Sequence, residues 1–175
     1  WFDQSSHKNK PVFRLHKENH NMFDTYQLEH QINAALCSEV ALACGGNLVI
    51  EETEALAVID VNSGSFIGKS IDQRTYLEVN LEAAVESARQ IILRNLSGII
   101  IVDFIDMQNA DHRVQVLQQL KQACSQDNIK TVISNFTELG LVQIARKRTS
   151  QSLSQVLCEP CSHCDARGYI KTDET

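Results

Sequence analysis

Hydrophobic and polar residues are arranged along the chain in patterns that predict an α/β fold. Apolar residues recur at helical spacing from Asp24 onward, and the pair Gly45-Gly46 marks the end of this predicted helix. Two extended runs follow, over residues 47–51 and 55–61, and the polar residues between them indicate a hairpin.

Beyond the hairpin, the pattern changes repeatedly between helix and strand. A capping-box sequence at Thr75–Glu78 begins a helix whose apolar face continues to Arg94. The apolar run Ile99–Val102 has the pattern of a strand that is buried on both sides. A helix over residues 112–125, a strand over 130–136 and a helix over 139–147 complete the pattern. This order predicts βαβ crossovers in a mixed α/β sheet.

Composition limits the class of protein. The chain has 43% hydrophobic and 22% charged residues, as globular proteins do. No apolar run reaches the roughly 18 residues of a membrane helix, and no signal-peptide pattern opens the chain. We therefore expect no membrane span and a cytoplasmic protein with reduced cysteines. The first residue is Trp1 rather than Met, which indicates a segment of a longer protein.

A net charge of −6 argues against a protein whose whole surface binds phosphates non-specifically. Contact with nucleic acid would then depend on a metal ion or on local basic clusters. Two such clusters occur, at residues 8–17 and at Arg146–Arg148, although solvated surfaces also contain such runs. The phosphate-binding loop of P-loop proteins and the glycine motif of dinucleotide-binding proteins do not occur, which argues against a nucleotide-binding domain.

Two predicted strands end in an aspartate. Leu56–Ile59 leads into Asp60, and Ile99–Val102 leads into Asp103. These strands flank a crossover helix and should be parallel, and ligands bind at the carboxyl edge of such sheets. If the strands are neighbours, about 4.8 Å apart, both carboxylates reach one cation at about 2.1 Å. Asn62 would point to the same face and add a neutral oxygen.

A divalent cation would relieve the repulsion between two such carboxylates, which are costly to bury unpaired. Mg²⁺ suits one or two carboxylates together with water and phosphate oxygens. It can polarise a phosphorus centre and help to generate a hydroxide nucleophile. The pattern therefore predicts a Mg²⁺ site. The alternative interpretation is that Asp60 and Asp103 only cap loops or pair with arginine or lysine.

The last three cysteines, Cys158, Cys161 and Cys164, form two overlapping C-x-x-C motifs. A closed zinc site needs four ligands, so one motif is completed most simply by the same pair from a second protomer. Cys158 and His163 allow a rival single-chain site, although adjacent His163 and Cys164 would need awkward geometry. Free thiols on a tail are a third interpretation, and a thioredoxin-like role lacks the strand-then-helix context.

Three blocks of the sequence resemble signatures of the RNase E/G endoribonucleases. They are Glu54–Gly64, Asn80–Ala84 and Gly98–Met107, and they occur in the family's order. The resemblance extends from about Asn19 to Thr172, and the loop over residues 64–68 is similar to that of the RNase G branch.

This resemblance implies a fold and a division of the chain. Residues 1–46 would be the end of an RNase H-like subdomain. Residues 47–150 would be a DNase I-like catalytic subdomain, and residues 151–175 a zinc-link segment. The family's oligonucleotide-binding and 5′-end-sensing domains would precede this region, and its dimerisation domain would follow it.

The resemblance also implies an activity. Asp60 and Asp103 would be Mg²⁺ ligands, and Asn62 would support them. Lys130 would contact the scissile phosphate, and Asp106 would be a supporting carboxylate. The implied reaction is cleavage of single-stranded RNA to 5′-phosphate and 3′-hydroxyl ends, in rRNA or tRNA processing or mRNA decay. A non-catalytic RNA-binding or assembly module is the alternative, which the complete acidic set disfavours.

The family's zinc pattern, C-P-x-C-x-G-x-G, aligns with Cys161 and Cys164. The resemblance therefore implies a zinc ion shared between the protomers of a homodimer. Ser162 stands where proline is usual and Ala166 where glycine is usual, so the loop departs from the family at two positions.

Overall fold

The computed structural model describes residues 15–17, 20–64 and 73–172, and it divides the chain into two units between Asn33 and Ala34. In the first unit, the side chain of Asn21 accepts a hydrogen bond from the Phe23 N–H at 3.0 Å and caps the short helix α1 (Met22–Thr25). Helix α2 (Leu28–Leu36) crosses the boundary between the units. None of the described helices is long and apolar enough to cross a membrane.

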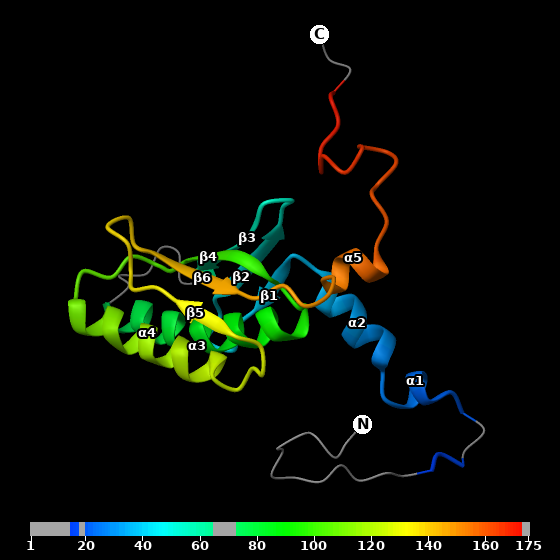
Figure 1. Cartoon of the computed structure of the whole chain (residues 1–175), viewed down its shortest axis with the longest axis horizontal. Helices are drawn as coiled ribbons and strands as arrows, with labels where there is room; N and C mark the ends of the chain where they lie inside the picture. The colour runs from blue at the N-terminus through cyan, green and yellow to red at the C-terminus, as the bar shows by residue number, and fades with distance from the viewer. Residues whose placement is uncertain (1–14, 18–19, 65–72, 173–175) are drawn as a thin grey trace. The chain divides into compact units, whose positions relative to one another are not determined.

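The second unit is built on one mixed sheet of six strands. The strands are β1 (Glu39–Ala41), β2 (Asn47–Glu52), β3 (Leu56–Asn62), β4 (Gly98–Asp103), β5 (Thr131–Ile133) and β6 (Leu141–Arg146). The helices that follow α2 are α3 (Gln73–Leu93), α4 (Ala110–Cys124) and α5 (Leu153–Leu157). The strand order is β1-β2-β3-β4-β6-β5 (Figure 1).

The connections explain why the sheet is mixed. Antiparallel pairing joins β1 to β2 and β2 to β3, whereas α3 carries the chain from β3 to a parallel neighbour, β4. Strand β6 lies between β4 and β5 and is antiparallel to both. The predicted α/β fold with a βαβ crossover is thus confirmed, with β3, α3 and β4 as the crossover unit.

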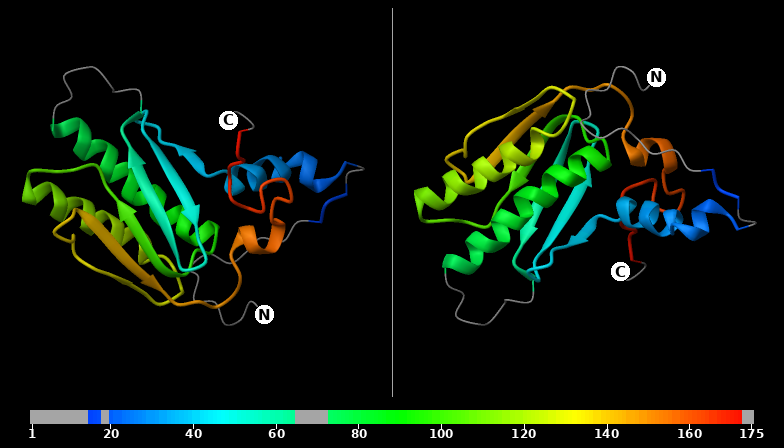
Figure 2. Two further views of the ribbon diagram at one scale, coloured as in Figure 1. Left: turned by 90° about the horizontal axis from the view of Figure 1, so that it is seen from above. Right: turned by 90° about the horizontal axis from the view of Figure 1, so that it is seen from below.

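Helices α3 and α4 pack together on one face of the sheet (Figure 2). Residues of β3 alternate accordingly, and Ala57, Ile59 and Val61 are buried while the residues between them are only partly buried. No described helix covers the opposite face of β3 and β4, and Ile99 is 53% exposed there. The prediction that Ile99–Val102 is buried on both sides is therefore wrong for this chain.

A buried arginine joins the ends of both long helices to the sheet. Arg146 of β6 donates from Nε to Asp127 Oδ2 at 2.7 Å and from Nη1 to the Leu96 carbonyl at 2.9 Å. Nη1 also donates to Asn95 Oδ1 at 2.8 Å. Because Asn95 and Leu96 follow α3 and Asp127 follows α4, the side chain of Arg146 satisfies polar groups at the ends of two helices and joins both helices to β6.

The C-terminal helix α5 begins with a capping box formed by Ser152 and Gln155. The hydroxyls of Ser152 and Ser154 also donate to Glu52 Oε2, at 3.0 and 2.7 Å. These bonds attach the start of α5 to the end of β2.

Most predicted elements are confirmed. The hairpin, the first long helix, the apolar strand and the second long helix correspond to β2–β3, α3, β4 and α4, each within two residues of the predicted bounds. The predicted boundaries at residues 46 and 150 stay predictions. The basic residues at 8–14 and the loop residues 65–68 lie outside the described residues.

The single helix predicted from Asp24 to Gly46 is wrong in its second half. Helix α2 ends at Leu36, and Val40 lies in β1, where it pairs with Leu48 of β2. The spacing of Val40 suits the apolar face of a helix, but pairing with β2 determines its conformation.

The helix predicted over residues 139–147 is also wrong, because this segment forms β6. Its residues alternate with period two, and Val142, Ile144 and Arg146 are buried. The predicted strand at 130–136 is shortened to β5, which pairs with the edge of β6.

Candidate active site

Asp60 and Asp103 lie side by side at the carboxyl ends of parallel strands. The register of β3 and β4 pairs Asp60 directly with Asp103, on the face that α3 and α4 leave open. The buried neighbours Ile59 and Val61 fix which face Asp60 occupies. Neighbouring strands lie about 4.8 Å apart, so both carboxylates can reach one small volume. The structure thus brings together the two aspartates that the sequence selects.

Asn62 lies beside Asp60 on the same face. Its Nδ2 donates a hydrogen bond to Asp60 Oδ2 at 2.9 Å, which holds one carboxylate oxygen in place. The amide oxygen of Asn62 is not used in this bond, so it can face a ligand or a water molecule.

The electrostatics of the pair are unfavourable without a cation. Desolvation of the Asp103 carboxyl raises its pKa above the usual value, and the negative charge of Asp60 raises the pKa further. Within the described part of the chain, the Asp103 carboxylate accepts no hydrogen bond from a side chain and forms no ion pair. The alternative that Asp103 pairs with arginine or lysine has no support among the described residues.

The residues present fit a hydrated divalent cation. No group of three or more His, Cys, Asp or Glu side chains among the described residues is arranged to hold a metal ion. Two carboxylates and one amide oxygen are too few for a closed protein cage. They suit Mg²⁺, which keeps several waters and takes further oxygens from phosphate.

The loop after β4 is anchored at several points. Phe104 is buried, and its ring centroid lies 5.8 Å from that of Phe136. Arg113 of α4 donates from Nε to the Met107 carbonyl at 2.8 Å and lies 3.5 Å from the Asp106 carboxylate. Asp106 therefore belongs to an exposed ion pair that steadies the loop.

Two polar residues of α3 contact the loops next to the acidic pair, and the sequence did not assign them a role. Asn80 bonds the backbone of Ile105, and Glu82 accepts bonds from the backbone of Ala43 and Cys44. The signal that was available is the block Asn80–Ala84, in which polar side chains interrupt an apolar helix face.

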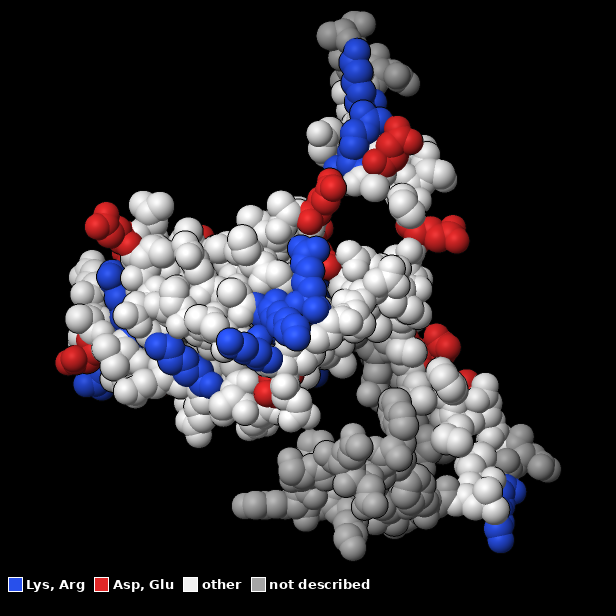
Figure 3. All heavy atoms as spheres, viewed as in Figure 1, with Lys and Arg blue, Asp and Glu red and all other residues white. Residues whose placement is uncertain are grey.

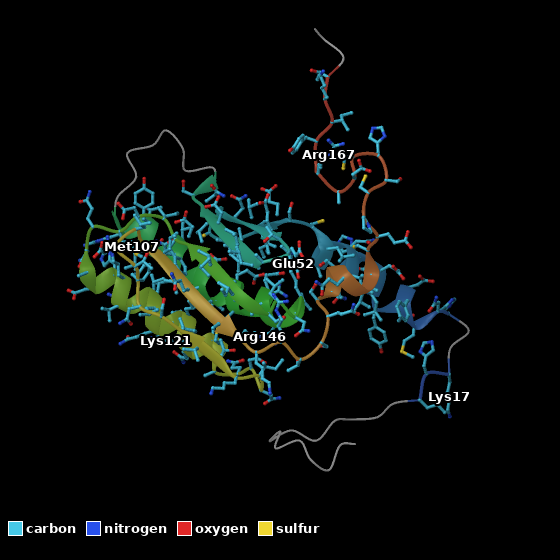
Figure 4. All side chains as sticks on the ribbon, turned by 45° about the horizontal axis from the view of Figure 1, so that its top comes forward. Lys17, Glu52, Met107, Lys121, Arg146 and Arg167 are labelled. Atoms are coloured by element: carbon cyan, nitrogen blue, oxygen red, sulfur yellow. The ribbon has the colours of Figure 1, made fainter. Side chains whose placement is uncertain are left out.

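Lys130 is not brought to the acidic pair. Thr131, the next residue, is level with Arg146 and Gly98, at the opposite end of the sheet from Asp103. Strand rise and spacing put this end roughly 20 Å from Asp103. Figure 4 shows the two ends, with Met107 near the acidic end and Arg146 at the other. The implied contact of Lys130 with the scissile phosphate is therefore not supported within one chain.

Lys130 instead belongs to a basic end of the sheet. It lines a pocket of about 540 Å³ with Lys121 and Ile133, and its carbonyl accepts a bond from the Lys147 N–H at 3.1 Å. Lys147 and Arg148 are exposed beyond β6, where Figure 3 shows basic side chains gathered in the middle of the view. Arg146 of the same run is different, because it is buried against Asp127.

Cys161 and Cys164 lie together in a tight turn. The N–H of Gly168 donates to Cys164 Sγ at 3.4 Å, and the Cys161 carbonyl accepts from the Ala166 N–H at 3.1 Å. The backbone N–H groups of Cys164 and His163 and the Cys164 thiol lower the pKa of Cys161, so its thiolate is favoured. This arrangement suits half of a tetrahedral zinc site.

The rival single-chain zinc site is not assembled. Cys158 is exposed, and no group of three cysteine or histidine side chains comes together among the described residues. Ala166 adopts a positive φ of 58°, the conformation that glycine would adopt without strain at this position of the family pattern. The departure at Ala166 therefore retains the turn at a cost in backbone strain.

Comparison with known proteins gives consistent matches. The family model described as "Ribonuclease E/G family" matches residues 1–149. The chain is 48% identical to ribonuclease G of Haemophilus influenzae over 161 residues, which are 92% of this chain and 33% of that protein. It is 49% identical to ribonuclease G of Salmonella typhimurium over 88% of this chain and 32% of that protein.

A third relative is ribonuclease E of Synechocystis, which is 39% identical over 97% of this chain and 25% of that protein. The matches confirm the resemblance drawn from the sequence blocks. The chain spans about a third of the length of the ribonuclease G relatives.

Proposed function

Because this chain belongs to the Ribonuclease E/G family, we propose that it carries the catalytic core of a Mg²⁺-dependent endoribonuclease. The observation that supports the proposal most strongly is the register pairing of Asp60 with Asp103 at the ends of β3 and β4. Two carboxylates without a cationic partner among the described residues need a metal ion to offset their repulsion.

The roles of the chain's own residues follow from their placement. Asp60 and Asp103 would hold the ion. The hydrogen bond from Asn62 Nδ2 to Asp60 Oδ2 would fix the orientation of the Asp60 carboxylate. A bound Mg²⁺ polarises a phosphate and favours hydroxide at neutral pH. The exposed face beside the pair leaves room for an RNA strand to approach.

The proposed substrate is single-stranded RNA, cut to leave 5′-phosphate and 3′-hydroxyl ends in rRNA or tRNA processing or in mRNA decay. Such a protein acts in the cytoplasm. Lys130, roughly 20 Å from the acidic pair, would meet a phosphate several nucleotides from the reacting one rather than the scissile phosphate.

We also propose that two chains share one zinc ion through Cys161 and Cys164, which gives a homodimer. The support is that each chain presents two adjacent thiols, whereas a structural zinc site needs four ligands.

A non-catalytic RNA-binding or assembly module is the second candidate, since the exposed cations at the far end of the sheet suit phosphate contacts. Cleavage of a fluorescent single-stranded RNA by the full-length protein separates the two. We expect cleavage with Mg²⁺, none with EDTA, and a loss of at least about a hundredfold in Asp103→Asn.

The matched control is Asp106→Asn, which removes a nearby carboxylate that pairs with Arg113 instead. It should cleave at nearly the wild-type rate. Activity that survives both EDTA and Asp103→Asn would reject the metal mechanism.

A further inference from the structure

Two polar side chains of helix α3 form hydrogen bonds with the loops on either side of the acidic pair. Asn80 and Glu82 are two positions apart, so they point about 200° away from each other around the helix. This spacing lets one turn of α3 reach the loop after β4 and also the turn between β1 and β2.

Asn80 uses both ends of its amide on a single residue. Its Nδ2 donates to the Ile105 carbonyl at 2.8 Å, and its Oδ1 accepts from the Ile105 N–H at 3.0 Å. Asn80 is fully buried, so it cannot exchange these bonds for water. Ile105 is two residues beyond Asp103, so Asn80 fixes the backbone that leaves this aspartate.

Glu82 acts on the other strand through the turn between β1 and β2. Its carboxylate accepts from the Ala43 N–H at 2.5 Å and from the Cys44 N–H at 3.0 Å. The turn then packs against β3, because a Cβ on Gly46 would lie 2.7 Å from the Asn62 carbonyl oxygen. Contacts therefore run from Glu82 to the backbone of the residue that holds Asp60.

We propose that α3 is a brace that sets the separation of Asp60 and Asp103, with Asn80 and Glu82 as its positioning residues. The inference rests on the proposed function, since it concerns the same acidic pair. Without these bonds, the backbone after Asp103 and the turn that packs on Asn62 would be less firmly held. Metal sites lose affinity when the groups that orient their ligands are removed.

The test measures Mn²⁺ binding to the full chain by electron paramagnetic resonance, with amide hydrogen exchange as a second readout. Asn80→Ala should weaken Mn²⁺ binding on the order of tenfold and speed exchange of the Ile105 N–H. Asn80→Asp keeps an acceptor for that N–H and should weaken binding less. Asn80→Asp also provides the binding measurement if the alanine variant fails to fold. Glu82→Gln, which retains one acceptor oxygen, should give a smaller weakening.

The matched control is Gln90→Ala in the same helix. Gln90 is buried, and its side-chain hydrogen bonds join it to Arg94 and Glu86, within α3 and at its end, rather than to either loop. This variant should lose stability and keep wild-type Mn²⁺ affinity. If Asn80→Ala frees the Ile105 N–H but binds Mn²⁺ as wild type does, the brace is overturned while the cation site stands. If wild type binds no Mn²⁺, or Asp103→Asn binds it equally well, the proposed function fails and the brace with it.

Discussion

Asp60 and Asp103 are register partners at the last paired position of β3 and β4, so two negative charges face each other on neighbouring strands. Neither receives an arginine or lysine partner among the described residues. The fold therefore holds an electrostatic repulsion at this edge of the sheet, and several measurable consequences depend on it.

Asp103→Asn should stabilise the protein in the absence of metal. The raised pKa of Asp103 means that its protonated form is favoured in the folded state, so the repulsion destabilises the fold increasingly as pH rises through that pKa. Because Asp103 is exposed, we expect a gain of less than about 1 kcal/mol at pH 7 and none in acid. Urea unfolding in EDTA, at pH 7 and in acid, measures the difference in unfolding free energy between Asp103→Asn and wild type. Added Mg²⁺ should stabilise wild type alone, and an equal effect on the variant would contradict the site.

Gly46→Ala should destabilise the fold and weaken cation binding. The new Cβ would lie 2.7 Å from the Asn62 carbonyl oxygen and 3.0 Å from Val79 Cγ1, so backbone must move. The expected cost is about 1–3 kcal/mol in urea unfolding. Gly140→Ala is the comparison, because its Cβ meets no atom within 4 Å and only its positive φ of 82° is strained. That variant should keep wild-type Mn²⁺ affinity, and equal affinity in both variants would contradict the role of the turn.

Arg146→Met should cost about 3–5 kcal/mol, because it leaves Asp127 without its partner and removes bonds to Asn95 and Leu96. Arg113→Met is the matched control, since the Arg113–Asp106 pair is exposed and should contribute at most about 1 kcal/mol. Chemical denaturation compares the two, and a similar loss in both would show that burial of Arg146 is unimportant.

Acid should remove the contribution of Asp127. Burial alone would raise the pKa of Asp127. The hydrogen bonds from Arg146 and from the Ile129 N–H outweigh this effect and hold the pKa below its usual value. A lowered folded-state pKa gives stability that is present above the unfolded pKa, near 3.9, and is lost as pH falls through the folded value. The stability difference between wild type and Asp127→Asn should therefore shrink below about pH 4, and a constant difference would contradict this origin.

Metal analysis should give half a zinc per chain, and Cys161→Ser should remove it. Cys158→Ser should retain the zinc, because Cys158 is exposed and apart from the pair. One zinc per chain that is lost in Cys158→Ser would indicate the single-chain site instead, and no zinc in wild type would reject both zinc sites.

Ala166→Gly should stabilise the turn by about 1 kcal/mol, since it relieves the positive φ of 58°.

Local sequence patterns were sufficient to predict an element wherever the spacing of its apolar residues suits only one conformation. The helix α3, the hairpin β2–β3 and the strand β4 follow from periodicity. The capping box predicted at Thr75–Glu78 is wrong, because α3 already begins at Gln73 and Thr75 lies inside the helix. The acidic pair could also be selected as a candidate, because both aspartates end apolar strands at the carboxyl edge of the sheet, where ligands bind.

Tertiary pairing decided the segments whose patterns suit two conformations. Residues 39–41 and 141–146 form strands because β2 and β4 offer free edges for hydrogen bonding, and local spacing does not contain that information. The register of β5 and β6 also explains why Lys130 lies far from Asp103, because it places Thr131 level with Gly98, at the start of β4, whereas Asp103 ends that strand.

The sequence by itself therefore determined which residues carry the candidate chemistry, since Asp60, Asn62 and Asp103 could be named from chain order alone. Only the tertiary structure decided how they are held. The register that pairs the two aspartates depends on hydrogen bonds between strands far apart in the chain, and so do the bonds of Asn80 and Glu82 to the flanking loops. Such contacts form only when α3 packs on the sheet, which is why a linear pattern could not reveal them.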